Sequence, residues 1–244
     1  MTRPGFQTLT INATAVYKIE LVAPGNSDTE HPGVQIIGEF ELKQGQKITT
    51  ALRQQGSSPL CGSGGSFLVL ESDEGPKPLL IAGGAGHAND IEFGRGNIKQ
   101  TAVGNENLGS SGKQKFVNGD KKNVYCAGAG YKKAPVLGWW TFLANQVSNL
   151  ADECVAPNSY KEGLTGGKGN RGEGGFGGGG GNYYREVNGE WKEYHGAGGG
   201  FTGGSTKVDG DWCYGGGGGS FSADPNAKFD HKYVGYGYCK ISSQ

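Results

Sequence analysis

The chain has 244 residues, 49 of them glycine, and its 23 basic residues balance 23 acidic ones. Because neither half carries a block of like charge, nucleic acid and anionic membranes are disfavoured as partners. No run of about 18 apolar residues is present, so we expect no membrane insertion. The first five residues lack the apolar core of a signal peptide, which indicates either a cytosolic protein or a chain whose leader has been removed.

The first 90 residues show the alternation of β-strands. Tyr17, Ile19 and Leu21 fall on one face of the segment 16–22 with charged residues between them, as in a half-buried strand. The same reasoning predicts strands at 6–10, 34–42, 48–52, 67–70 and 79–82, with a hairpin turn at 44–46. Residues 236–241 also alternate, and we expect this last strand to return to the N-terminal sheet. Together these elements predict an antiparallel sandwich.

The middle of the chain is less regular. Residues 83–122 are polar and rich in turn formers, and we interpret them as loops. In the segment 138–153, Trp139, Leu143 and Val147 fall at helical spacing and predict one short amphipathic helix. Its aromatic residues cover more than one face, which favours a helix packed on the sandwich over a helix that binds a partner.

The segment Gly163–Gly219 is the most unusual part of the chain, because 25 of its 57 residues are glycine. Glycine in a regular helix or strand costs about 0.5–1 kcal/mol relative to alanine. The segment is therefore either a flexible low-complexity chain or a packed lattice of extended polyproline-II segments that only glycine can enter. Disordered chains are poor in aromatic residues. The lattice is favoured by the aromatic residues that interleave with these glycines: Phe176, Tyr183, Tyr184, Trp191, Tyr194, Phe201, Trp212, Tyr214 and Phe221.

Three groups of motifs carry a family resemblance. They are Ala15–Leu21 with Gly38–Gln46, Gly64–Val69 with Pro78–Gly86, and the glycine clusters Gly174–Gly181, Gly198–Gly204 and Gly215–Ser220. Their order along nearly the full chain is similar to the glycine-rich extracellular domain of the anaplastic lymphoma kinase and leukocyte tyrosine kinase receptors. The resemblance implies a domain that displays protein-binding surfaces without catalysis. The chain carries no kinase, membrane span or cysteine-rich module, so receptor signalling is not implied, and no ligand-contact motif matches.

The expected fold combines the residue patterns with this resemblance. It is mainly β: a jelly-roll or tumour-necrosis-factor-like antiparallel sandwich with an inserted bundle of glycine-rich polyproline-II helices and one short α-helix. We expect a single domain, 1–244. Within it, 1–90 and 229–244 form the sandwich, 91–162 form loops and the helix, and 163–228 form the polyglycine bundle.

Five cysteines are compatible with reduced thiols, but the resemblance favours an oxidising compartment and an extracellular or cell-surface location. Cys126 and Cys154 flank the predicted helix, and Cys213 and Cys239 connect the last glycine cluster to the closing strand. We predict disulfides within these two pairs and an unpaired Cys61. The single glycosylation sequon, Asn12-Ala13-Thr14, is a weaker sign of secretion.

Motifs for catalysis or cofactor binding are nearly absent. Residues 79–86 are similar to a strand entering a dinucleotide-binding loop, but no helix is predicted at 87–96 to receive a pyrophosphate. The four histidines are far apart in the sequence, and Asp209-Gly210-Asp211 lacks the other ligands of a calcium loop. We therefore expect no enzyme, no metal and no cofactor.

A hairpin is predicted at 182–195, with its turn at Asn188-Gly189. We expect Glu190 and Lys192 to share a face with Tyr184, and Trp191 to lie on the other. These residues either bind a partner or only cover glycine backbone; our candidates for binding are Tyr184, Glu190, Trp191, Lys192 and Trp212.

The expected function is a non-catalytic extracellular protein-recognition or adhesion module. The partner is a protein: a receptor, a ligand or copies of the same chain. The alternative is a self-assembling structural subunit of a surface coat, matrix or appendage.

Overall fold

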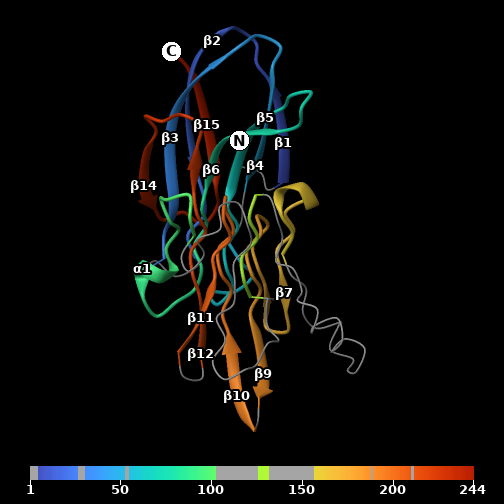
Figure 1. Cartoon of the computed structure of the whole chain (residues 1–244), viewed down its shortest axis with the longest axis vertical. Coiled ribbons are helices and arrows are strands. Elements are labelled where there is room, and N and C mark those ends of the chain that lie inside the picture. Colours follow the sequence, from blue (N-terminus) through green and yellow to red (C-terminus); the bar gives the residue numbers. More distant parts are fainter. Residues whose placement is uncertain are drawn as a thin grey trace.

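The computed structural model describes residues 5–26, 31–52, 55–102, 126–131, 157–187, 189–209 and 212–244. These residues form mainly β-structure in antiparallel sheets (Figure 1). One sheet has five strands in the order β1 (Gly5–Thr10), β4 (Lys47–Leu52), β5 (Ser66–Leu70), β6 (Lys77–Ala82) and β13 (Phe221–Ser222). A second has four, in the order β14 (Lys228–Lys232), β3 (Gly33–Leu42), β2 (Ala15–Val22) and β15 (Tyr238–Ser243).

The strands predicted in the first 90 residues are confirmed, with bounds that shift by one or two residues. The predicted return of the last strand is also confirmed, because β15 pairs antiparallel with β2 from Tyr238↔Val22 to Ser243↔Tyr17. The turn at 44–46 joins β3 to β4, and Gly45 adopts φ +86°, a conformation that favours glycine. Two strands of these sheets, β13 and β14, were not predicted, because β13 has only two residues and β14 contains a single apolar residue, Phe229, so neither shows apolar alternation.

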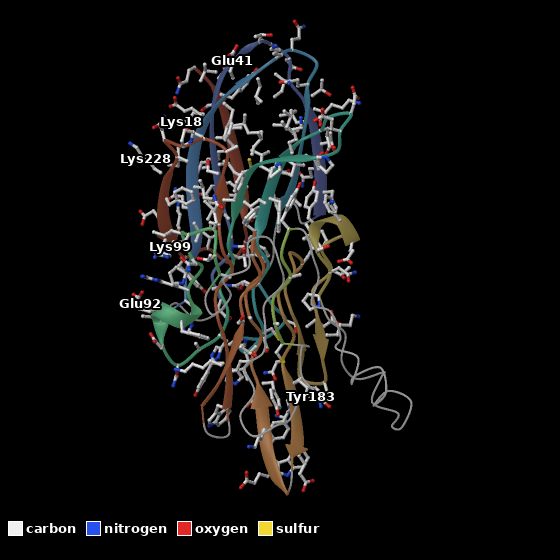
Figure 2. All side chains as sticks on the ribbon, viewed as in Figure 1. Lys18, Glu41, Glu92, Lys99, Tyr183 and Lys228 are labelled. Carbon is white, nitrogen blue, oxygen red and sulfur yellow. The ribbon has the colours of Figure 1, made fainter. Side chains whose placement is uncertain are left out.

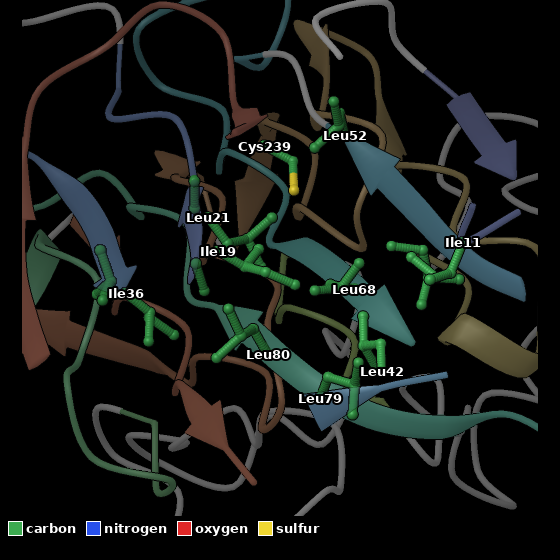
Figure 3. Close-up of a cluster of buried hydrophobic side chains, with 14 residues drawn as sticks. Ile11, Ile19, Leu21, Ile36, Leu42, Leu52, Leu68, Leu79, Leu80 and Cys239 are labelled. Atoms are coloured by element: carbon green, nitrogen blue, oxygen red, sulfur yellow. The ribbon is translucent and has the colours of Figure 1, made fainter. Parts of the chain in front are cut away.

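Side chains from both sheets meet in one buried cluster (Figure 3). The alternation along β2 directs Ile19 and Leu21 inward, where both are fully buried, and leaves Lys18 exposed. From the five-stranded sheet, Leu68 and Leu80 enter the same cluster. The apolar surface removed from water here, at about 25 cal/mol per Å², is the main stabilisation of this part of the molecule.

The loops predicted at 83–122 are described only as far as residue 102, and they contain one helical turn, α1 (Ile91–Gly94). The side chain of Asp90 caps it by accepting a hydrogen bond from the Glu92 amide at 2.9 Å. A single turn is too short to give a helical pattern of apolar residues, so the sequence did not predict it. A 3₁₀ helix, η2 (Tyr160–Glu162), follows later in the chain. The helix predicted at 138–153 lies outside the described residues, and within the described ranges no helix is long and apolar enough to span a membrane.

The glycine-rich region is packed. The clusters Gly177–Gly181, Gly198–Gly200 and Gly215–Gly219 are all buried. Backbone hydrogen bonds connect neighbouring segments, as from the amide of Gly198 to the carbonyl of Gly216 at 2.9 Å. This packing leaves no room for side chains, since a Cβ on Gly198 would lie 2.1 Å from the carbonyl oxygen of Gly84.

Further strands extend from this packed region. A small two-stranded sheet is formed by β7 (Lys168–Gly169) and β8 (Gly172–Glu173). Four more strands form a sheet at the end of the elongated molecule opposite β2 and β15, which we call the end sheet (Figure 1). Its order is β11 (Thr206–Asp209), β12 (Trp212–Gly215), β10 (Glu190–Tyr194) and β9 (Tyr183–Val187).

Candidate functional site

The predicted hairpin at 182–195 is confirmed and forms half of the end sheet. β9 and β10 pair antiparallel over five residues, from Tyr183↔Tyr194 to Val187↔Glu190. Gly189, in the turn, has φ +84°, which glycine adopts without strain. The Asn-Gly signal therefore located the turn correctly.

The predicted distribution of side chains on the two hairpin faces is wrong. Trp191 pairs with Glu186, and Lys192 pairs with Arg185. Residues directly opposite each other share a face, so Trp191 lies on the face of Glu186 and of Tyr184, which is two residues away on the same strand. Glu190 and Lys192 lie on the opposite face. In a hairpin with a two-residue turn, each even-numbered residue of one strand pairs with an odd-numbered residue of the other. The sequence interpretation had instead placed even-numbered residues of both strands on one face.

Tyr184, Trp191 and Trp212 share one surface of the end sheet, which we call the aromatic face. Trp212 on β12 pairs with Glu193 of β10, two residues from Trp191 and therefore on the same side. Trp191 is 57% exposed and Trp212 is 48% exposed, although both are large apolar side chains. Of the five candidate binding residues, the structure thus brings three together.

Trp191 is held in place by a stack of planar groups. Its indole lies 4.9 Å from the Tyr184 ring, measured between centroids, with 10° between the planes. The guanidinium carbon of Arg171 lies 4.2 Å from the centre of the same tyrosine ring. Such stacking and cation–π contacts each contribute on the order of 0.5–1.5 kcal/mol. An exposed indole in this setting presents a broad surface with little freedom left to lose on binding.

The strands of the end sheet continue into the packed glycine segments. β9 follows Gly177–Gly181, β10 leads into Gly196, β11 follows Gly203 and Gly204, and β12 ends in Gly215–Gly219. These segments touch backbone to backbone. A Cβ on Gly196 would lie 2.0 Å from the carbonyl oxygen of Gly180, and one on Gly215 would lie 2.1 Å from that of Gly196. The aromatic face therefore stands on a base that only glycine can form.

One side chain covers the outer edge of β9 at Tyr184. The Asn170 amide donates to the Tyr184 carbonyl at 2.7 Å, and its oxygen accepts from the Tyr184 amide at 2.9 Å. Asn170 thus satisfies both backbone groups that a further strand would use at this position. Exposed strand edges pair readily with other chains, and a cover of this kind opposes such pairing.

A buried polar group lies next to Trp212 of the aromatic face. His195 is 3% exposed, its Nδ1 lies 2.9 Å from Nδ1 of His87, and its ring centroid lies 5.7 Å from that of Trp212. Burial, and secondarily the charge of His87, lowers the pKa of His195 to about 3. Within the described part of the chain, Nε2 of His195 has no hydrogen-bond partner, although Oε2 of Glu193 is 4.0 Å away. The neutral imidazole is the form that this environment accepts.

The remaining predicted residues lie in several places. Asn12 is exposed in the connection between β1 and β2, so the sequon is accessible. Cys61 is buried, Cys126 donates from Sγ to the Tyr194 carbonyl at 3.6 Å, and Cys239 lies in the core between the two sheets. Cys154 and the side chain of Cys213 lie outside the described residues, so both disulfide pairings stay predictions.

Among the described residues, no group of three or more His, Cys, Asp or Glu side chains is arranged to hold a metal ion. Comparison of the sequence with protein-family models and with curated proteins gave no match.

Proposed function

We propose that this protein is a non-catalytic extracellular recognition or adhesion module, and that its aromatic face binds a protein partner. The observation that carries the proposal is the exposure of Trp191 and Trp212 on one side of a sheet built on packed backbone. Tryptophan and tyrosine dominate the energetics of protein interfaces, because they bury large areas at little entropic cost. The extracellular location is supported by the family resemblance and by the exposed sequon at Asn12.

A finer description of the fold belongs to the same proposal. The two antiparallel sheets would form a jelly-roll or tumour-necrosis-factor-like sandwich, and the glycine segments a bundle of polyproline-II helices. Two observations support this. The sheets share one buried cluster, and the glycine segments form backbone hydrogen bonds with one another while lying too close together to accommodate a Cβ.

The test uses the fluorescently labelled protein as a probe on intact cells of its own source, before and after mild protease treatment of those cells. Binding that the protease abolishes identifies a protein partner. Trp191→Ala and Trp212→Ala should each reduce this binding at least tenfold, because central interface residues of this type often contribute about 2 kcal/mol or more. The matched control is Tyr236→Ala, since Tyr236 is 64% exposed but lies outside the end sheet.

Equal loss in the Tyr236→Ala control, or full binding by both tryptophan variants, would contradict the assignment of the aromatic face. Mass measured under non-denaturing conditions, with and without reductant, addresses the alternative. A discrete monomer agrees with recognition, whereas a polymer indicates a self-assembling structural subunit.

A further inference from the structure

A pocket of about 260 Å³ lies beside helix α1, in a part of the chain that does not belong to the end sheet. Glu92 and residues 95–99 form most of its wall, and His231 of β14 completes the lining. Glu92 and Lys99 are seen on the same side of the molecule (Figure 2). The side chains that line it are those of Glu92, Arg95, Asn97, Ile98, Lys99 and His231.

The backbone of this wall is fixed by its neighbours. The amide of Asn97 donates to the carbonyl of Gly218 at 2.8 Å, and the carbonyl of Lys99 accepts from the amide of Ser220 at 2.8 Å. The packing is close here too, since a Cβ on Gly217 would lie 1.8 Å from the carbonyl oxygen of Arg95. The last glycine cluster thus fixes the backbone of the pocket wall, which removes backbone ordering from the entropic cost of binding a ligand.

The polar groups around the pocket are mainly donors. Arg95 and Lys99 carry positive charge, and Glu92, the acidic residue of the lining, is already paired with Arg95. Because Oδ1 of Asn97 accepts from the Lys99 amide at 3.0 Å, the NH₂ group of Asn97 remains as a donor. Nε2 of His231 lies 2.9 Å from the Gly96 carbonyl, and a carbonyl only accepts, so Nε2 donates its hydrogen to Gly96 and is not counted among the donors for a ligand.

We propose that this pocket binds a small polar ligand, about the size of one sugar ring, through a single anionic oxygen group such as a carboxylate or phosphate. The lining has one positive charge in excess, counting Arg95, Lys99 and Glu92. Arginine and lysine bind such oxyanions by charge-assisted hydrogen bonds. The volume is slightly below the roughly 300 Å³ at which drug-sized ligand pockets begin, which suits a ligand of one ring. Ile98, 42% exposed, offers an apolar surface to that ring.

The experiment is calorimetric titration of the full chain with four probes: glucose 6-phosphate, glucuronate, glucose and inorganic phosphate. Chloride is kept low because salt screens exposed charges. The two anionic sugars should bind, and glucose should not. Lys99→Gln should weaken the anionic sugars about tenfold, the usual effect of losing a hydrogen bond to a charged group. Lys161→Gln is the matched control, because Lys161 is an exposed lysine on η2.

Absence of binding by both anionic sugars overturns the proposal, as does equal binding by wild type and Lys99→Gln. Inorganic phosphate that binds as tightly as glucose 6-phosphate overturns the sugar-sized part of it, since the ring would then contribute nothing. The result is independent of the aromatic face, and Trp191→Ala should leave all four titrations unchanged. Failure of one site is therefore distinguishable from failure of the other.

Discussion

The ring of Tyr184 on β9 lies parallel to the indole of Trp191 on β10, with the ring centroids 4.9 Å apart. The two residues are diagonal neighbours across the hairpin, since Trp191 pairs directly with Glu186. Their contact holds the indole against the sheet while leaving it 57% exposed. A side chain that is both ordered and exposed is better prepared for binding than for stabilising the fold.

Tyr184→Ala should therefore affect binding more than stability. Removing the ring frees the Trp191 indole, and binding to the protease-sensitive partner should fall several-fold. The free energy of unfolding should drop by only about 1 kcal/mol, because cross-strand and aromatic pairs contribute little more than that. Thermal unfolding and cell binding are measured on the same preparation. A large loss of stability with unchanged binding would show that the hairpin only covers the glycine backbone.

Gly179→Ala should severely destabilise the protein. A Cβ at this position would lie 2.2 Å from the carbonyl oxygen of Gly62 and 2.9 Å from the amide of Gly175. Both contacts are with backbone atoms, so neither can be relieved by rotating a side chain, and we expect a cost of about 3 kcal/mol or more. The branched Gly179→Val should be worse still.

Gly235→Ala is the matched control for this prediction, because the nearest atom to its added Cβ is Oε1 of Gln55 at 3.8 Å. It should melt within a few degrees of the wild type. If Gly179→Ala behaves like Gly235→Ala in thermal unfolding and proteolysis, the close backbone packing is refuted.

The sequence predicted the features that arise from a repeating pattern of apolar residues or from two adjacent residues. Alternation over Val16–Val22 and Val34–Leu42 located two long strands, and Asn188-Gly189 located the hairpin turn. The register across that turn was not predicted, because it depends on whether the turn contains two residues or three. That one-residue difference moved Trp191 to the other face.

The candidate sites were less accessible to prediction. The aromatic face depends on β10 pairing in parallel with β12, a contact between segments about 20 residues apart that leaves no local signal. The pocket at Arg95 and Lys99 requires His231 from β14, more than 100 residues later in the chain. Both sites rest on glycine segments whose neighbours are set by the whole packing and not by composition.

Asn170→Ala should promote association through the edge of β9. The variant loses both hydrogen bonds to the Tyr184 backbone, at 2.7 and 2.9 Å, and exposes the edge to another chain. Sedimentation velocity should show dimers or larger species at concentrations where the wild type sediments as one species. Asn226→Ala, a change at an exposed asparagine, is the control and should sediment as the wild type does. Identical sedimentation of both variants would show that Asn170 does not protect this edge.

In reduced protein that keeps its fold, the Cys239 thiol should resist chemical modification. It is 2% exposed among core side chains (Figure 3), and burial raises its pKa to about 12. Since the thiolate is the reactive form, iodoacetamide at pH 8 should modify Cys239 only after the protein is unfolded. Peptide mapping of native and denatured samples tests this and, under non-reducing conditions, the predicted Cys213–Cys239 and Cys126–Cys154 bridges. Rapid labelling of Cys239 in the native protein would contradict its position in the core.

Mild acid should destabilise the protein through His195. The folded-state pKa of about 3 lies below the ordinary value of 6.5, so the folded protein holds the neutral imidazole while the unfolded chain takes up a proton. The free energy of unfolding is therefore highest above pH 6.5. It decreases as the pH falls from 6.5 toward 3, by about 1.4 kcal/mol per pH unit. Denaturant unfolding between pH 7 and 4.5 avoids most carboxylate titration. His195→Gln should flatten this dependence, whereas His231→Gln, at a partly exposed histidine, should retain it. An equally steep decline in wild type and His195→Gln would mean that another group titrates.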